Sequence, residues 1–409
     1  MGPSRPRWTR IWLFLATVCC SLVCCSLLAS GALAQGGPAR VGAVLSQTGA
    51  ARALGGAQAA ALRSLVAEWG RTSSDTVLEL VIADDLSLPA AAIREARRLV
   101  EEEGVLALIC CSPPEATAAL APYLEGAGVL TLSPSALPEG SASEGAAFWL
   151  FSLEPDRRRL LQASVLAQAA AGHTRFGLMT LEGDFGDAVA AELASLIDPA
   201  AGVQLVVEQR YPQGASVLTP EALWVATRLP ETVFVWGDSA DSVLALRALA
   251  ARGYRGEVVL DPTVLGGDGL AAGGFGAGGL TPGGLERFGA LRAPVSPAAV
   301  ADTLSPLHLT YGLTQAYRAA VPPRSPAAGA YAYDALRLVA AALEQAYTYG
   351  VAGDDPRVLR GVLRDAFIGM GPVAGAGASY DFREGDPVGV LPQSLVLSRL
   401  EGGRLVSPD

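Results

Sequence analysis

The chain has 409 residues, and its 30 strongly basic residues, set against 40 acidic ones, are all arginine. The lack of lysine excludes Schiff-base chemistry and a phosphate loop that depends on lysine. A net negative charge without long basic runs argues against nucleic acid and anionic lipid as partners. The length suffices for two ordinary domains, and the apolar patterning excludes a disordered chain.

Residues 1–34 have the organisation of a secretory signal peptide. Three arginines within 1–10 precede an apolar run over 11–28, and Ala32 and Ala34 supply the small residues that a signal peptidase recognises. A retained membrane anchor is the alternative for an apolar stretch of this length. We expect cleavage, a periplasmic location and no stable membrane anchor. The mature chain then carries 27 basic and 40 acidic residues, a net charge of −13.

The cysteines give little functional signal. Four lie within the apolar run, and none follows the small residue that a lipid-modified cysteine requires. Cys110 and Cys111 are adjacent and can close only a strained ring, so we interpret them as small buried apolar side chains and leave their redox state open. His173 and His308 add no metal-site spacing. We therefore expect no metal and no cofactor.

The first half of the mature chain alternates short apolar runs with segments of helical spacing. The expected strands are 41–45, 77–83, 105–110 and 129–132, and the expected helices are 58–69, 89–103 and 115–125. Gly49, Gly55 and Gly56 are interpreted as loop residues, and Asp84 and Asp85 as a solvated strand end. Short apolar strands between helices of 10–15 residues predict βαβ units around a parallel sheet buried on both faces.

The same pattern restarts further along the chain. The expected strands are 176–180, 203–211, 232–236 and 257–260, and the expected helices end near 196, 229 and 252. A glycine-rich stretch over 266–289 is interpreted as a flexible connection. A long helix over 327–349 and strands at 379–382 and 393–400 complete the chain. The predicted fold class is α/β, with two doubly wound parallel-sheet lobes.

Several short motifs occur in a characteristic order along almost the whole mature chain. They lie at 41–49, 83–85, 127–134, 183–186, 316–318, 332–335 and 380–386. In this order the chain resembles the type I periplasmic solute-binding proteins, the branched-chain amino-acid and amide receptor group of ABC importers. The resemblance implies a three-strand hinge with crossovers near 152–155, 287–293 and 373–379. It assigns 35–152 plus 290–377 to lobe one and 153–289 plus 378–409 to lobe two.

Ligands of open parallel sheets bind beyond the carboxyl ends of the strands. The loops there offer hydroxyls, apolar faces and the free N–H groups of helix N-termini. The predicted ligand-binding residues are Ser46, Gly49, Ser112, Pro113, Ser133, Ser135, Asp184, Phe185, Trp236, Asp238 and Thr263. The alternative is structural: the serines as helix caps or turn formers, and Trp236 as a core residue.

The resembled group also shows where this chain differs. Its amino-acid-binding members hold the ligand carboxylate with a serine after the third strand and Ala-x-Thr after the fourth, and the ammonium with a tyrosine and a glutamate in lobe two. The corresponding residues of this chain are Pro114, Ser135, Leu137, Ser239 and Thr263. An amino-acid site is therefore not visibly retained. Asp238 or Asp241 could supply the acid from a shifted position, and a neutral or acidic solute is the competing interpretation.

The chain lacks the motifs of the common enzyme classes. It has no Gly-x-Ser-x-Gly nucleophile elbow, and its glycine-rich stretch does not join a strand to a helix. We predict a non-enzymatic receptor that closes two lobes on an amino-acid-like, amide or neutral solute and delivers it to the membrane permease of an ABC importer. The alternative is a scaffold of the same fold that regulates a cell-envelope enzyme without a transported ligand. An extracellular sensor partner is a third possibility.

Overall fold

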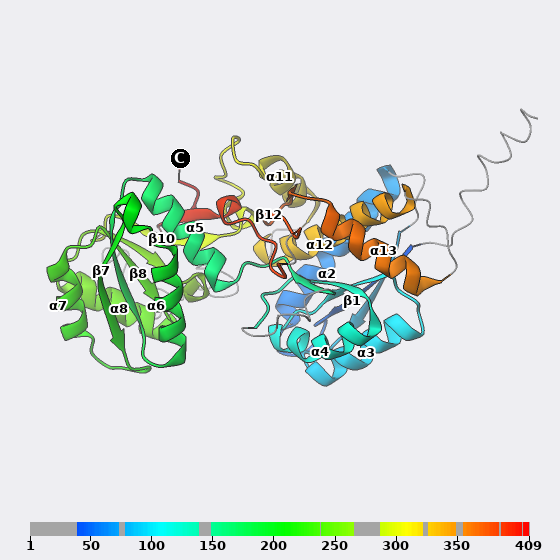
Figure 1. The fold of residues 1–409 in the computed structure, drawn as a ribbon, viewed down its shortest axis with the longest axis horizontal. Helices are drawn as coiled ribbons and strands as arrows, with labels where there is room; N and C mark the ends of the chain where they lie inside the picture. Colours follow the sequence, from blue (N-terminus) through cyan, green and yellow to red (C-terminus); the bar gives the residue numbers. More distant parts are fainter. Residues whose placement is uncertain are drawn as a thin grey trace, which may run out of the picture.

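The structure is a computed structural model, and it describes residues 39–72, 78–138, 149–237, 239–265, 287–321, 326–348, 355–383, 386–402 and 404–408. The predicted signal peptide and residues 266–286 of the glycine-rich stretch lie outside these ranges. The described residues form two bodies side by side, one blue, cyan and orange, the other green (Figure 1). Within the described ranges, none of the helices combines the length and the apolar character needed to cross a bilayer.

The first body is built on a parallel sheet with the strand order β2-β1-β3-β4-β5. Its strands are β1 (Ala39–Leu45), β2 (Leu78–Asp84), β3 (Ala107–Cys110), β4 (Leu130–Ser133) and β5 (Leu150–Ser152). Along β1, Ala43 and Leu45 pack into one hydrophobic cluster and Val44 into another. Both faces of this sheet are therefore buried, as continuous apolar strands predict.

Helices cover both faces of the first sheet (Figure 1). One face carries α2 (Arg52–Thr72), α12 (Pro326–Thr348) and α13 (Pro356–Gly369), and the other carries α3 (Pro89–Glu101) and α4 (Pro114–Ala127). Gly55 lies in the first turn of α2, where a Cβ would stand 2.1 Å from the carbonyl oxygen of Ser46. The loop predicted through Gly56 is therefore wrong, because the absence of a side chain at Gly55 serves close helix packing.

The second body is built on a sheet with the order β14-β13-β10-β9-β8-β6-β7. Its strands are β6 (Arg175–Leu181), β7 (Gln204–Tyr211), β8 (Thr232–Trp236), β9 (Glu257–Leu260), β10 (Leu291–Val295), β13 (Val396–Glu401) and β14 (Arg404–Val406). Strands β6 to β10 are parallel, and β13 and β14 are antiparallel to their neighbours. The helices are α5 (Arg157–Ala170) and α6 (Asp184–Leu196) on one face, and α7 (Thr219–Arg228) and α8 (Ser239–Ala251) on the other.

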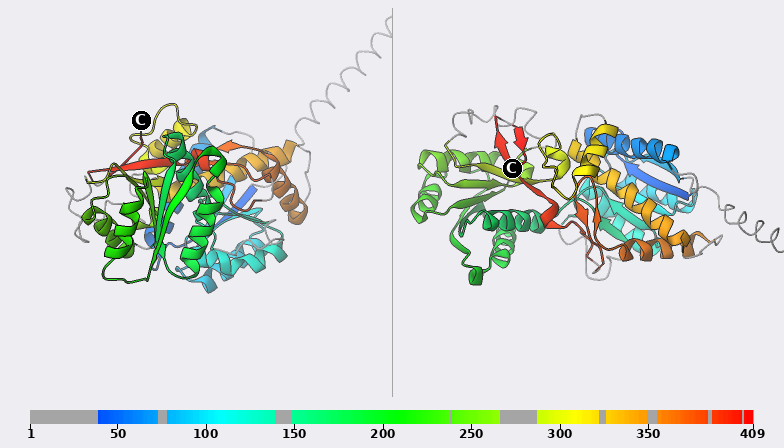
Figure 2. Two further views of the ribbon diagram at one scale, coloured as in Figure 1. Left: turned by 60° about the vertical axis from the view of Figure 1, so that its left-hand side comes forward. Right: turned by 90° about the horizontal axis from the view of Figure 1, so that it is seen from above.

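Three crossovers join the two bodies (Figure 2). The first runs from β5 to α5, the second from β10 to the short helix η4 (Pro297–Val300), and the third from β12 (Ser379–Tyr380) to β13. The first and third crossovers are bonded to one another, since Ser152 N donates to Pro387 O at 2.7 Å. In the second crossover, Ser296 Oγ donates at 2.8 Å to Gly377 O, just before β12. Strands β5 and β10 enter the crossovers at their carboxyl ends. The carboxyl ends of both sheets therefore border the hinge.

The chain changes sheets later than the expected lobe boundaries at 290 and 378. Strand β10 pairs with β9 and β13, so its side chains belong to the core of the second sheet. Phe382 lies 5.5 Å from Phe151 and 4.7 Å from Phe367, ring centroid to ring centroid, in the core of the first body. The expected boundaries at 290 and 378 assign β10 to lobe one and Phe382 to lobe two, which is wrong in both cases. Local sequence does not reveal the parallel pairing of β10 or the aromatic packing of Phe382.

One buried carboxylate fastens to α12 the segment that leads into the third crossover. Asp334 accepts hydrogen bonds from Ala376 N, Gly377 N and Tyr380 Oη, each at 2.7 Å. Burial raises the pKa of Asp334 to about 6 despite these three donors. The chain is therefore held to a helix of the first body just before it crosses to the second body.

Candidate functional site

The predicted binding residues lie at the carboxyl ends of the strands in both bodies. We call these regions the lobe-one edge, formed by Ser46, Asp84, Asp85, Ser112, Ser133 and Ser135, and the lobe-two edge, formed by Glu182, Asp184, Phe185, Asp241, Asp261 and Thr263. Gly49 and Pro113 flank the first edge, with Gly49 exposed at a φ of 83° and Pro113 preceding α4. Asp238 lies outside the described residues.

The structure brings the four predicted serines together. Ser112 is the centre: its hydroxyl donates to Gln58 Oε1 at 2.7 Å and accepts from Ser46 N at 3.0 Å. Ser135 Oγ donates to Ser112 O at 2.7 Å, and Gln58 Nε2 lies 3.4 Å from Ser135 Oγ. Ser133 Oγ donates to Ser135 O at 2.7 Å. All four serines are at most 2% exposed, so the lobe-one edge is a buried and internally bonded network.

Two acids of the lobe-one edge extend this network. Asp85 is fully buried, and its Oδ1 accepts from Ser46 Oγ at 2.6 Å and from Ser87 N at 2.8 Å. Asp84 accepts from Gln47 N, Thr48 N and Thr48 Oγ1. Burial acts to raise the pKa of Asp84, but the hydrogen bonds outweigh it and lower that pKa overall. The prediction of a solvated acidic pair is therefore wrong for Asp85.

Strand β3 ends in a disulfide between Cys110 and Cys111, both fully buried. The peptide bond between them is cis, and their Cα atoms lie 3.0 Å apart. This corrects the interpretation of the pair as two separate apolar side chains. The next helix, α4, starts with Pro114 after Pro113, and neither residue has a backbone N–H.

Part of the lobe-two edge, at Glu182, Asp184 and Phe185, is open, whereas the lobe-one edge is closed. Glu182 and Asp184 are exposed, and their carboxylates bond to no other described residue. Phe185 is 40% exposed, and the guanidinium of Arg157 lies 5.5 Å from its ring centroid. Arg157 also pairs with Glu192 at 2.8 and 3.1 Å. This edge therefore presents acidic groups and an aromatic face to its surroundings.

The remaining lobe-two residues are mostly engaged within the chain. Trp236 is 1% exposed and packs in the core with Phe176 and Phe234, so its side chain is not part of the edge surface. Asp261 accepts from Thr263 N at 2.9 Å and Thr263 Oγ1 at 2.7 Å, and burial raises its pKa. Asp241 is 4% exposed and lies 3.2 Å from Gly214 N.

Glu154 lies in the first crossover, next to the lobe-one edge. Its Oε2 accepts from Ala136 N at 2.8 Å, while its own carbonyl accepts from Ser152 Oγ at 3.0 Å. Burial raises the pKa of Glu154 to about 7. The hinge thus contains a carboxylate that titrates near neutral pH.

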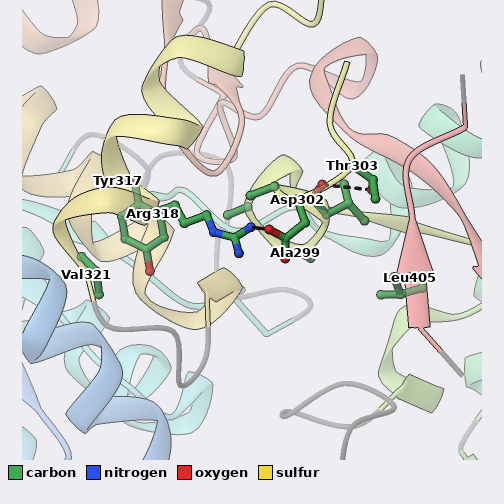
Figure 3. Close-up of a pocket in the computed structure, with 10 residues that line it drawn as sticks. Ala299, Asp302, Thr303, Tyr317, Arg318, Val321 and Leu405 are labelled. Atoms are coloured by element: carbon green, nitrogen blue, oxygen red, sulfur yellow. Dashed lines mark hydrogen bonds and ion pairs between the residues drawn. The ribbon is translucent and has the colours of Figure 1, made fainter. Parts of the chain in front are cut away.

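Two cavities border the hinge. One of about 200 Å³ is lined by η4, the turn after it, α11 (Tyr311–Ala320) and Leu405, and contains the Arg318–Asp302 ion pair (Figure 3). The other, of about 410 Å³, lies between the start of α5 and the third crossover. Neither is lined by a predicted ligand-binding residue, so these residues are located by the strand ends and not by either cavity.

Sequence reasoning missed Gln58, Asp85 and Glu154. The sequence predicts Gln58 only as a helix residue, and the one signal for Asp85 is its place at the carboxyl end of a strand. Nothing in local sequence marks Glu154 as a hinge carboxylate. Among the described residues, no group of three or more His, Cys, Asp or Glu side chains is placed to hold a metal ion.

The comparisons with known proteins agree with this architecture. The family model for the periplasmic binding proteins matches residues 38–403. A comparison with curated proteins gives no match. At identities of 20% or less, a likeness to a solved structure shows the fold alone.

Three solved structures illustrate the match. A proposed branched-chain amino acid ABC transporter from Rhodospirillum rubrum has 20% identity and a TM-score of 0.71, over 91% of this chain and 100% of that one. An extracellular ligand-binding receptor from Rhodopseudomonas palustris HaA2 has 20% identity and a TM-score of 0.64, over 91% and 100%. A leucine binding protein from Thermotoga maritima has 17% identity and a TM-score of 0.57, over 90% and 97%. With two α/β lobes and a family model that spans nearly the whole described chain, this protein belongs to the periplasmic binding protein family.

Proposed function

We propose that this chain is the solute-binding receptor of an ABC importer and that it closes its two lobes on a small organic ligand, either amino-acid-like or an amide or neutral solute. The observation that supports this most strongly is the position of the hinge. Both sheets enter it at their strand carboxyl ends, so the lobe-one and lobe-two edges flank the same three crossovers. A ligand between the lobes would therefore contact both edges.

Closure follows from simple thermodynamics. A ligand that contacts both edges at once has more favourable interactions in the closed state than in the open one, and it shifts the population toward closure. A rigid first edge suits this role, because little conformational entropy is lost there on binding. The proposed ligand contacts are the predicted binding residues that lie in the two edges, together with Gln58 and Glu154. These predicted residues are Ser46, Ser112, Ser133, Ser135, Asp184, Phe185 and Thr263.

The proposed partners are the small-molecule ligand and the membrane permease of the importer. The proposed location of the mature protein is the periplasm, in line with the signal peptide predicted at 1–34; a receptor of this family meets its solute there. Binding rather than catalysis is the proposed role of the site. Its serine hydroxyls already donate within the chain, as in a structural network.

A ligand screen on the mature protein tests this proposal. We expect at least one compound among amino acids, amides, short acids and alcohols to raise the melting temperature by several degrees, as mass action requires for a ligand that binds only the folded state. The same compound should reduce the radius of gyration in small-angle X-ray scattering. Melting that no compound changes would contradict the proposal.

The internally satisfied serine network also supports a second candidate, a scaffold that regulates a cell-envelope enzyme. A site whose donors are all used within the chain needs no solute to be complete. Pull-down of envelope proteins by the mature chain distinguishes the two candidates. A stable partner enzyme together with an empty ligand screen would favour the scaffold.

A further inference from the structure

The hydroxyl protons of the lobe-one edge are already committed. Each serine hydroxyl has one proton to donate. Ser46 gives its proton to Asp85, Ser112 to Gln58, and Ser135 to a backbone carbonyl, each at 2.6–2.7 Å. Ser133 does the same toward Ser135 O. A ligand carboxylate needs donors, and at this edge it would have to break existing buried bonds to obtain them.

Two backbone donors of the lobe-one edge, the amides of Gln47 and Thr48, are committed as well. Asp84 accepts the amide protons of Gln47 and Thr48 in the loop that precedes α2. An internal carboxylate therefore already occupies this cluster of amides. Helix α4 has no N–H at Pro113 or Pro114, which removes two of the groups that normally bind an anion at a helix N-terminus.

The lobe-two edge also disfavours a ligand carboxylate. The first turn of α6 contains Asp184 and Asp187, and that of α8 contains Asp241. These acids lie at the positive ends of their helices, where a ligand anion would otherwise bind. Arg157 is paired with Glu192. An incoming carboxylate would meet negative charge of the same sign.

Acceptors, in contrast, are left over. Asp85 Oδ2 is buried and receives no hydrogen bond from the described residues. Glu182 and Asp184 expose carboxylates that bond to no described residue. Buried acceptors call for donors, and exposed carboxylates attract a cation. Among the described side chains of the two edges, the unpartnered groups are thus carboxylate oxygens, whereas the serine hydroxyls have no proton left to donate.

We propose that the site between the two edges selects a small solute that carries a positively charged nitrogen and no free carboxylate. The chemical class is a primary amine or an amino-acid amide. This inference rests on the proposed receptor function and sharpens it. The exposed guanidinium of Arg52 at the start of α2 would repel a cationic ligand. The proposal requires that the attraction of the acids at the two edges exceeds this repulsion.

Matched compounds test this class directly. Alanine, leucine and phenylalanine are each compared with the corresponding amide, the decarboxylated amine and the deaminated acid, by thermal shift and calorimetry on the mature protein. For at least one skeleton we expect the amine and the amide to bind, the amino acid to bind at least tenfold more weakly, and the acid not to bind. Tighter binding of the amino acid or the acid than of the amide would overturn the proposal.

Failure of this proposal and failure of the receptor function give different results. If a broad panel yields binders that are only neutral or carboxylate-bearing, the amine class is wrong and the receptor stands. If no compound of any class binds, the receptor function itself is contradicted. Each outcome is read from the same melting curves.

A charge-removing variant tests the residues. Glu182→Gln combined with Asp184→Asn should weaken amine binding at least fivefold, because it removes the two exposed carboxylates. Asp198→Asn is the matched control, since Asp198 follows the other end of α6 and Asn can still accept from Ala200 N. Equal affinity of the double variant and the control for the amine would overturn the role assigned to the lobe-two edge.

Discussion

The lobe-one and lobe-two edges both lie at strand carboxyl ends, but they differ in how far their side chains are buried. At the lobe-one edge the polar side chains are buried and bond to one another through Ser112. At the lobe-two edge Asp184 and Phe185 are exposed. Buried groups that are hydrogen-bonded stabilise a fold, whereas exposed groups cost little stability and stay available to a ligand. We therefore interpret the first edge as a rigid platform and the second as the source of ligand discrimination.

Both edges nevertheless contain a glycine at which a helix packs closely on a strand end. Replacing either glycine gives the largest expected change in the free energy of unfolding. A Cβ at Gly55 would stand 2.1 Å from Ser46 O, and one at Gly186 would stand 1.6 Å from Leu181 O. Each glycine lets the first turn of a helix pack on the end of a strand. We expect Gly55→Ala and Gly186→Ala each to lower the free energy of unfolding by about 3 kcal/mol or more, measured by urea denaturation.

Gly56 is the matched control for these two variants. It follows Gly55 in α2, but a Cβ there would meet no atom within 4 Å. Gly56→Ala should stabilise the protein by about 0.5–1 kcal/mol, because alanine favours the helix. Similar losses at Gly55 and Gly56 would contradict the packing argument.

The second-largest expected effect distinguishes the two edges by the stability that each loses on substitution. Gln58→Leu removes the amide that accepts from Ser112 Oγ, and it leaves buried polar groups without partners. We expect a loss of about 2–3 kcal/mol in the free energy of unfolding. The lobe-two variant Asp184→Asn should change it by less than about 0.5 kcal/mol. Equal losses in the two variants would contradict the distinction between a platform and an exposed edge.

Glu154, in the first crossover, gives a smaller, pH-dependent effect. Its folded pKa of about 7 lies above the ordinary value of 4.5, so the folded chain binds this proton more tightly than the unfolded chain. Stability from this group is present below about pH 4.5 and is lost as the pH rises through 7. Glu154→Gln should therefore be more stable than the parent by about 1–2 kcal/mol at pH 8 and equal to it near pH 4.5.

The measurement is chemical denaturation of both proteins across this pH range. Asp334 titrates with the same sign, with a pKa of about 6, but it is present in both proteins and cancels in the difference. A difference in stability that does not vary with pH would show that the variant changes packing and not ionisation.

The fold could be predicted further than the site. Apolar runs and helical spacing located most strands of both sheets, because burial on both faces leaves a local signature. Strand β10 was missed, since Arg292 and Pro294 interrupt its apolar pattern and only its pairing with β9 makes it a strand. The third crossover depends on contacts with Phe151 and Phe367 from distant segments.

At the site, the position of strand carboxyl ends predicts where the serines lie, but not whether their hydroxyls are hydrogen-bonded within the chain. Whether Ser112 is free or bonded depends on Gln58, which lies 54 positions away. The disulfide between Cys110 and Cys111 depends on a backbone conformation that composition does not reveal. Position along a strand is therefore predictable from sequence, whereas hydrogen-bond partnership is set by long-range packing.

The smallest expected effect is at Phe185. Its ring is 40% exposed and contacts Arg157, so truncation removes little buried area and one exposed cation–π contact. Phe185→Ala should cost less than about 1 kcal/mol of unfolding free energy in urea denaturation. A ligand that packs on this ring should nevertheless bind more weakly to the variant in calorimetry. A large loss of stability would instead make Phe185 part of the core, and the contrast between the two edges would then fail at the residue on which it most depends.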